Sequence, residues 1–342
     1  MDHYAADGIE FVLLIGNPAP DGNGPAALPM KQVWPRRGAT SDQDSVTDYF
    51  FADLTGNWDL DGDTYYGEWT DYALPGGVDL LAEVTVGRIP YYGDPAALDA
   101  ILQKTMDYES DPGGEWRLSA LFPMGFQEAG YDGAPLAEQI WDDYLATAGF
   151  SRWRQYQQGS AACGPDSAYP SEQELRGGTL VRDRWAAGRY GLVVWWGHGD
   201  ESATQVGYQG CWDGTLLDSA QTVVFDSSQR AFVYQNSCLN GYPEDPTNLG
   251  YALLQRGAVA TVSASRVSWF NTGEGYGDFD GSTTNAGIGY EVVRRLAAGM
   301  PVGQALYAAK GSLAPQMATR LMNAYDFNLY CLLYTSPSPR DS

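Results

Sequence analysis

Residues 191–202 read GLVVWWGHGDES. The unbroken apolar run Leu192–Trp196 is typical of a strand that is buried on both faces of a parallel sheet. It ends in Gly197-His198-Gly199, and His198 is one of only two histidines in the chain. Because glycines let a backbone come close to another molecule, a histidine in this position is a candidate for chemistry at the end of the strand.

A second apolar strand with a reactive residue at its end lies in AFVYQNSCLNGY, residues 231–242. If the two strands are parallel neighbours, His198 and Cys238 meet at the carboxyl edge of the sheet, where open α/β folds bind ligands. The imidazole would then raise the thiolate fraction or hold a thiolate as an ion pair. The amides of Gly199 and Cys238 would form an oxyanion hole. Taken singly, a histidine here is more often a buried, hydrogen-bonded core residue, and a cysteine here is more often an inert core thiol. Their joint position at matching strand ends favours the catalytic interpretation.

The rest of the chain alternates strands and helices, which predicts a mostly parallel sheet covered on both faces. Ser171 and Glu174 have the spacing of a capping box, so the sequence predicts that a helix begins at Ser171. The break ESDPGGEWR at 109–117 indicates a boundary between two subdomains. Further strands are expected at 9–15, 49–53, 83–89, 118–126, 152–156, 231–236 and 258–263, and helices at 95–108, 134–147, 171–188, 248–256, 286–298 and 301–313.

Composition limits the function of the 342-residue chain. Its net charge of −23 and pI of about 4.2 argue against nucleic acid as a partner, because phosphates would be repelled. No run of 18 apolar residues occurs, so no membrane span is expected. The acidity fits either a soluble or salt-adapted protein or one that binds calcium.

Both ends of the chain look interrupted. The abrupt start before the first strand suggests that the natural N-terminus is missing, so the lack of a signal peptide says nothing about location. Residues 331–342, CLLYTSPSPRDS, resemble a translated sequencing adapter and are left out of the fold prediction.

Cys163 and Cys211 lie in loop-like stretches, where they either pair in an oxidising compartment or stay as free thiols.

An acidic loop is the candidate metal site. In DLTGNWDLDGDTYYGEW, Asp59, Asp61 and Asp63 alternate, and Glu68 follows five residues later. Alternate side chains of a tight loop can converge on one hard cation. The glycine position excludes an EF-hand. The loop therefore fits either a structural Ca²⁺ site or an acidic turn in solvent.

The strand ends and their neighbours resemble the gingipain-type cysteine peptidases, bacterial and archaeal relatives of caspases, legumains and separase. The resemblance rests on YGLVVWWGHGDES, AFVYQNSCLNGY and NLGYALLQRGAVATVSASRVSW, and it extends over about residues 9–330. It implies a caspase-like α/β fold, with an N-terminal subdomain at 1–115 and a catalytic subdomain at 116–330. Within the resemblance, His198 matches the catalytic histidine, Cys238 the nucleophile and Gly199 an oxyanion donor.

The resemblance also implies roles around the substrate. Trp269 matches an aromatic wall of the specificity pocket, and Ser265 in the same segment joins the substrate-binding set. Glu128 lies where the family can place a carboxylate that orients the histidine. Asp132 lies near the acid that receives a substrate arginine in arginine-specific members, although the loop is shorter here. Core packing for Trp269 and solvated loop acids for Glu128 and Asp132 are the alternatives.

The sequence thus predicts a cysteine endopeptidase that acts on polypeptides through an acyl-enzyme, with a preference for a basic residue before the cut. No cofactor is expected for catalysis, and no Walker-type phosphate loop for a nucleotide is present. The chain also lacks the G-x-S-x-G motif of a serine hydrolase. An extracellular or cell-surface location follows from the resemblance. The alternatives are a processing peptidase or transpeptidase of secreted proteins, and a catalytically inactive binding module with the same fold.

Overall fold

The computed structural model describes residues 4–37, 44–111, 113–158, 167–319 and 321–331. A nine-stranded sheet runs through the whole molecule in the order β1-β4-β16-β15-β14-β10-β5-β8-β9. Its strands are β1 (Phe11–Gly16), β4 (Thr85–Pro90), β5 (Ser119–Met124), β8 (Ser151–Gln157), β9 (Gln173–Leu175), β10 (Leu192–Trp196), β14 (Ala231–Asn236), β15 (Ala258–Ala264) and β16 (Phe327–Tyr330).

The sheet consists of two parallel blocks that run in opposite directions. Strands β1, β4 and β16 are parallel to one another, and β15, β14, β10, β5, β8 and β9 form the second parallel block. The blocks meet at the antiparallel pair β15–β16. The two predicted subdomains therefore share one sheet, and β16, the last strand of the described residues, lies between β4 and β15 in its interior. The subdomain boundary itself stays a prediction.

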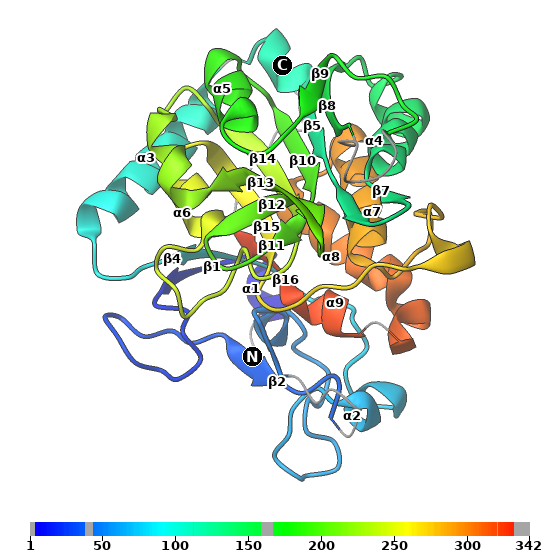
Figure 1. Ribbon diagram of the computed structural model, residues 1–342. Coiled ribbons are helices and arrows are strands. Elements are labelled where there is room, and N and C mark those ends of the chain that lie inside the picture. Colours follow the sequence, from blue (N-terminus) through cyan, green and yellow to red (C-terminus); the bar gives the residue numbers. More distant parts are fainter. Residues whose placement is uncertain (1–3, 38–43, 112, 159–166, 320, 332–342) are drawn as a thin grey trace.

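Helices cover both faces of the sheet (Figure 1). Alternate residues of β10 explain this: Leu192, Val194 and Trp196 belong to one apolar cluster, whereas Val193 and Trp195 belong to the other. Both faces exclude water, as the apolar run predicts. The helices are α1 (Tyr4–Asp7), α2 (Trp69–Ala73), α3 (Pro95–Ser110), α4 (Ala134–Ile140), α5 (Leu180–Ala187), α6 (Leu249–Gln255), α7 (Asn285–Ala297), α8 (Val302–Leu313) and α9 (Leu321–Asp326).

The structure also contains smaller sheets that are separate from the nine-stranded sheet. The hairpin β12 (Ala203–Tyr208) and β13 (Cys211–Asp218) is joined by the two-residue strand β11 (His198–Gly199). A second pair is β2 (Lys31–Val33) with β3 (Ser45–Thr47), and a third is β6 (Phe126–Glu128) with β7 (Tyr131–Asp132). No helix among the described residues combines the length and the apolar character needed to cross a membrane.

Two predicted elements are wrong. The strand predicted at 49–53 is a short 3-10 helix, Tyr49–Phe51, that follows β3. The helix predicted from Ser171 begins only at Leu180, and Glu174 lies in β9, which pairs in parallel with β8. At Glu174 the pairing with β8 decides the local structure, which local propensity does not reveal. At Tyr49 the chain closes local turn hydrogen bonds to Asp48 O and Tyr49 O instead of joining a sheet.

Candidate functional site

Two neighbouring parallel strands bring His198 and Cys238 to the same edge of the sheet. The register of β10 and β14 pairs Trp196 with Asn236, the last residue of each strand. His198 and Cys238 each lie two residues beyond this pair. The predicted parallel neighbours are therefore confirmed, and the two segments leave the sheet side by side at its carboxyl edge.

The backbones of the two segments are in direct contact at Gly199. A Cβ atom added to Gly199 would lie 2.1 Å from the carbonyl oxygen of Cys238 and 3.0 Å from its amide nitrogen. The glycine is thus required by space, since real Cβ contacts are never this short. Gly199 lies in β11, where it pairs with Thr204 of β12. This packing places the Gly199 backbone next to the Cys238 amide.

Cys238 is half-buried, and its thiol donates to the carbonyl oxygen of Ser268 at an Sγ–O distance of 3.6 Å. Burial raises the pKa of the thiol, because removal from water disfavours the thiolate. The next residue, Leu239, has a φ of 59°, a left-handed conformation that is uncommon outside glycine. Its amide donates to Arg266 O at 3.0 Å, which anchors the turn that follows the thiol.

His198 is held by a main-chain carbonyl. Its Nε2 lies 2.5 Å from the carbonyl oxygen of Gln127 in β6. Because a carbonyl only accepts, Nε2 carries the proton and the lone pair resides on Nδ1. Trp212 of β13 packs edge-on against the imidazole, with ring centroids 5.2 Å apart. The oxygen that contacts the imidazole is therefore the main-chain carbonyl of Gln127. Glu128 was predicted to orient the histidine, and its side chain is exposed.

Trp269 and Asp132 lie on partly exposed segments near the strand ends. Trp269 is half-buried, with its indole nitrogen against Met322 Sδ at 3.2 Å and the guanidinium of Arg36 over its ring at 5.0 Å. Asp132 pairs with Phe126 in the β6–β7 hairpin. Its carboxylate accepts from the Ser167 hydroxyl at 2.5 Å and from the Ala134 amide at 2.9 Å. Burial raises its pKa.

Ser265 does not face the substrate side. It is fully buried, and its hydroxyl donates to Val46 O at 2.8 Å, which ties β15 to β3. Its role is to join these two elements. Cys211 begins β13 and is disulfide-bonded. Its predicted partner Cys163 lies outside the described residues, so the pairing stays a prediction.

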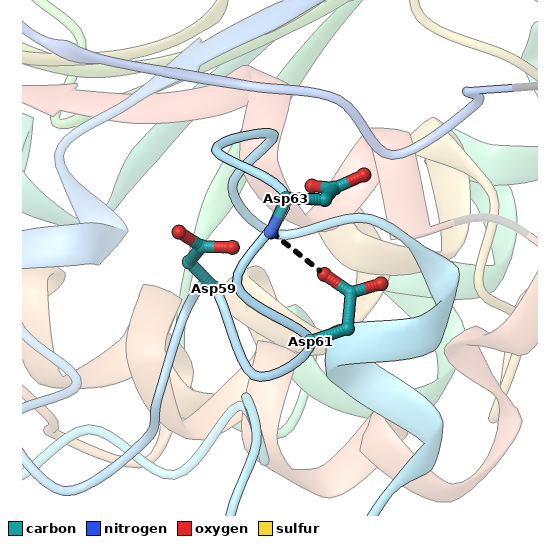
Figure 2. A group of neighbouring side chains, drawn as sticks. All are labelled: Asp59, Asp61 and Asp63. Carbon is teal, nitrogen blue, oxygen red and sulfur yellow. Dashed lines mark hydrogen bonds between the residues drawn. The ribbon is translucent and has the colours of Figure 1, made fainter.

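Three carboxylates converge in the acidic loop (Figure 2). One oxygen from each of Asp59, Asp61 and Asp63 lies within 4.8 Å of the others. Glu68 is not part of this group. It accepts from the hydroxyl of Thr70 at 2.5 Å and from Arg37 at 2.9 Å. Arg37 also contacts Asp63, so one cation already faces one edge of the cluster.

The aspartate loop also holds itself together through its own backbone. Asp59 accepts from the amide of Thr64, Asp61 from that of Asp63, and Asp63 from that of Tyr65, at 3.2, 3.3 and 2.8 Å. The second oxygen of Asp63 faces Arg37, and that of Asp61 accepts from the hydroxyl of Thr70 at 3.3 Å. The three aspartates still present hard oxygen ligands of the kind that Ca²⁺ takes, but an ion there would share Asp61 and Asp63 with these partners.

Sequence reasoning missed two groups that touch the imidazole. Gln127 acts through its carbonyl, which carries no side-chain signature. Trp212 reaches His198 only because the β12–β13 hairpin folds back over the strand end. The segment GCWDG, residues 210–214, contains turn residues and an aromatic residue. These residues could have indicated a hairpin, but not that it reaches His198.

Comparisons with known proteins identify the family and the fold. The family model of peptidase family C25 matches residues 1–332. Among solved structures, the Arg-specific cysteine proteinase gingipain R has a TM-score of 0.69 at 15% identity, covering 98% of this chain and 66% of that one. A complex of the pro- and mature domains of RgpB from Porphyromonas gingivalis gives 0.67 at 15%, with coverage of 98% and 67%. Another protease structure gives 0.59 at 13%, with coverage of 98% and 66%.

The chain spans about two thirds of the length of these solved proteins. At such identities the likeness shows a common fold. The comparison with curated proteins finds no match.

Proposed function

The chain belongs to peptidase family C25, and from this premise we propose that it is a cysteine endopeptidase in which Cys238 is the nucleophile and His198 the proton carrier. The observation that carries the proposal is the equal offset of the two residues beyond the paired ends of β10 and β14. This places a thiol and an imidazole on one sheet edge, together with two backbone amides.

The hydrogen bond of His198 determines which ring nitrogen can accept a proton. With Nε2–H directed at Gln127 O, Nδ1 is the atom that can accept the thiol proton. Cys238 Sγ attacks the scissile carbonyl carbon as this proton moves to Nδ1. The imidazolium then protonates the leaving amine, which leaves a thioester. Water then attacks the thioester carbon while His198 takes up its proton. The C–S bond breaks, the imidazolium returns the proton to the Cys238 sulfur, and the product leaves with a free carboxyl group.

Charge develops on the substrate carbonyl oxygen during both steps. The Gly199 and Cys238 amides are the donors for this oxygen, and the contact of Gly199 with the Cys238 backbone supports their proximity. Pre-oriented donors of this kind are each worth about 10²–10³ in rate. Any side chain at position 199 would push the backbones of Gly199 and Cys238 apart.

The substrate class is polypeptide, with a basic residue before the scissile bond. Asp132 is the acid for that residue, and Trp269 is the aromatic wall. The position of Asp132 in the hairpin that also supplies Gln127 supports this assignment. A substrate cation would have to share the carboxylate with Ser167 and the Ala134 amide. It would gain a charge-assisted hydrogen bond there.

We also propose a structural Ca²⁺ bound by Asp59, Asp61 and Asp63. The ion would neutralise three carboxylates that repel one another, and it would take no part in the reaction. An extracellular or cell-surface location belongs to the same proposal, and the disulfide-bonded Cys211 supports an oxidising compartment.

The test is the turnover of fluorogenic peptides with Arg, Lys, Leu, Asp or Asn before the reporter. We expect cleavage after Arg or Lys that disappears in Cys238→Ala and falls at least a thousandfold in His198→Ala. Asp132→Asn should weaken the preference for Arg and Lys while retaining thiol alkylation. Cleavage that persists in Cys238→Ala would overturn the proposal, and a preference for Leu would overturn the basic specificity alone.

A further inference from the structure

Beneath the proposed catalytic pair lies a buried hydrogen-bond network with Asn240 at its centre. Asn240 Oδ1 accepts from the hydroxyl of Thr204 at 2.7 Å and from the hydroxyl of Ser237. Its Nδ2 donates to Asp200 O at 2.7 Å and to Ala203 O at 3.0 Å. We call Asn240, Thr204 and Ser237 the amide clamp. All three are at most 2% exposed.

The amide clamp joins the two segments that supply the proposed oxyanion donors. Thr204 is the strand partner of Gly199, and Asp200 follows Gly199 in the chain. Ser237 directly precedes Cys238, and its hydroxyl also accepts from the indole of Trp195 at 3.2 Å. A single side-chain amide therefore bonds to both the histidine segment and the cysteine segment.

We infer that Asn240 is a positioning residue that sets the spacing between the Gly199 and Cys238 amides, and that Thr204 transmits this setting to Gly199. This inference rests on the proposed function. Asn240 uses its oxygen and both of its N–H groups, so the network is fully satisfied at that side chain. Satisfied buried networks specify one arrangement, because any displacement leaves a polar group unpaired.

The expected consequence is specific to acyl transfer. An oxyanion hole contributes only when its donors reach the position that the oxyanion will take. Loosening the clamp should therefore slow peptide cleavage and spare reactions of the thiol that form no oxyanion. Alkylation of Cys238 by iodoacetamide is such a reaction, because the thiolate displaces iodide directly and no carbonyl carbon becomes tetrahedral.

The experiment compares Thr204→Val, Thr204→Ser and Asn240→Asp with the parent chain. Thr204→Val removes one hydroxyl and keeps the methyl group that packs beside Gly197. Thr204→Ser keeps the hydroxyl. The matched control is Thr222→Val, which removes an equally buried hydroxyl that donates to Ser219 O at 2.8 Å, outside the clamp. The measurements are kcat and KM for the best peptide, the iodoacetamide rate and the melting temperature.

We expect Thr204→Val to lower kcat about tenfold to a hundredfold, with KM and the alkylation rate within twofold of the parent. Thr204→Ser should recover most of kcat, and Asn240→Asp should lose more than Thr204→Val. If Thr204→Val cleaves as well as Thr222→Val, or if alkylation falls in step with kcat, the clamp does not position the donors. If the parent chain cleaves no peptide and Cys238 ignores acylating probes, both this inference and the proposed function are overturned.

Discussion

At the level of single residues, the protonation state of Cys238 decides how the proposed reaction begins. The thiol donates to Ser268 O, and burial raises its pKa. The raised pKa favours the neutral thiol, and the hydrogen bond of His198 Nε2 to Gln127 O leaves Nδ1 as the proposed proton acceptor. Of the two possibilities that the sequence leaves open, this favours proton transfer during attack over a preformed thiolate–imidazolium pair.

The rate of Cys238 alkylation by iodoacetamide should therefore rise steadily with pH. Only the thiolate reacts, and a raised pKa keeps its fraction small until the solution passes the ordinary thiol range, about pH 8.5. The expected curve has no plateau below that value. Mass spectrometry of the Cys238 peptide across pH 5–10 measures it, with Cys238→Ala as the blank. A plateau reached already in mildly acidic solution would instead establish the ion pair.

Other single residues show the limit of sequence reading. The positions of His198 and Cys238 at the sheet edge could be predicted, because each follows a mostly apolar run that is itself typical of a buried strand. The Gln127 carbonyl could not be predicted, because a backbone oxygen has no residue signature and reaches His198 only through the β6–β7 hairpin. Ser265 was assigned to the substrate from its sequence neighbours, whereas its side chain turns inward to β3.

At the level of elements, two strands in the middle of the sheet were predictable to the residue. The predicted strands at 192–196 and 231–236 are β10 and β14, since short, mostly apolar runs of this kind are typical of strands buried on both faces. Other buried strands were predicted with shifted ends, as at 83–89, where β4 is Thr85–Pro90. The segment at 171–179 was not predictable. It is polar and carries a capping-box pattern, but the edge of β8 offers hydrogen bonds that only the folded sheet presents.

The aspartate loop is the element whose stability should depend on calcium. Its three carboxylates repel one another in a chain of net charge −23, and an ion between them removes that repulsion. At about 10 mM Ca²⁺ and a millimolar Kd, linkage gives about 1–2 kcal/mol. We expect the melting temperature to rise by a few degrees with Ca²⁺, more than with Mg²⁺ or with NaCl of equal ionic strength.

Two variants separate the loop from the general acidity of the chain. Asp61→Asn should abolish most of the calcium-specific shift, whereas Asp280→Asn, at an exposed aspartate far along the chain, should keep it. Equal shifts with Ca²⁺ and with matched NaCl would mean that the loop is a solvated acidic turn held by Arg37.

At the level of the whole molecule, the two parallel blocks depend on one another. Strand β16 pairs with β15 on one side and with β4 on the other, so the N-terminal and C-terminal parts share backbone hydrogen bonds. Arg88 of β4 lies at this junction, because it pairs with Tyr330 of β16 and its partner Asp48 donates its amide to Asn328 Oδ1 of β16 at 3.0 Å. Its guanidinium is fully buried and bonds both oxygens of Asp48, at 2.6 and 2.7 Å, as well as Leu28 O at 2.6 Å.

We therefore expect both blocks to unfold in one transition, even when the junction is weakened. Arg88→Met leaves the Asp48 carboxylate buried without its partner, which costs about 3–5 kcal/mol. Calorimetry should show a single unfolding peak at a lower temperature. Hydrogen exchange should accelerate together in β1, β4, β10 and β14. The control is Arg176→Met, which removes an exposed surface pair with Glu174 and should move the peak little. If β10 and β14 stay protected after β1 and β4 exchange, the two sequence-predicted subdomains fold separately and the common sheet is only a docked interface. In that case the proposed catalytic edge would survive without the N-terminal block, because His198 and Cys238 directly follow β10 and β14, two strands of the second block.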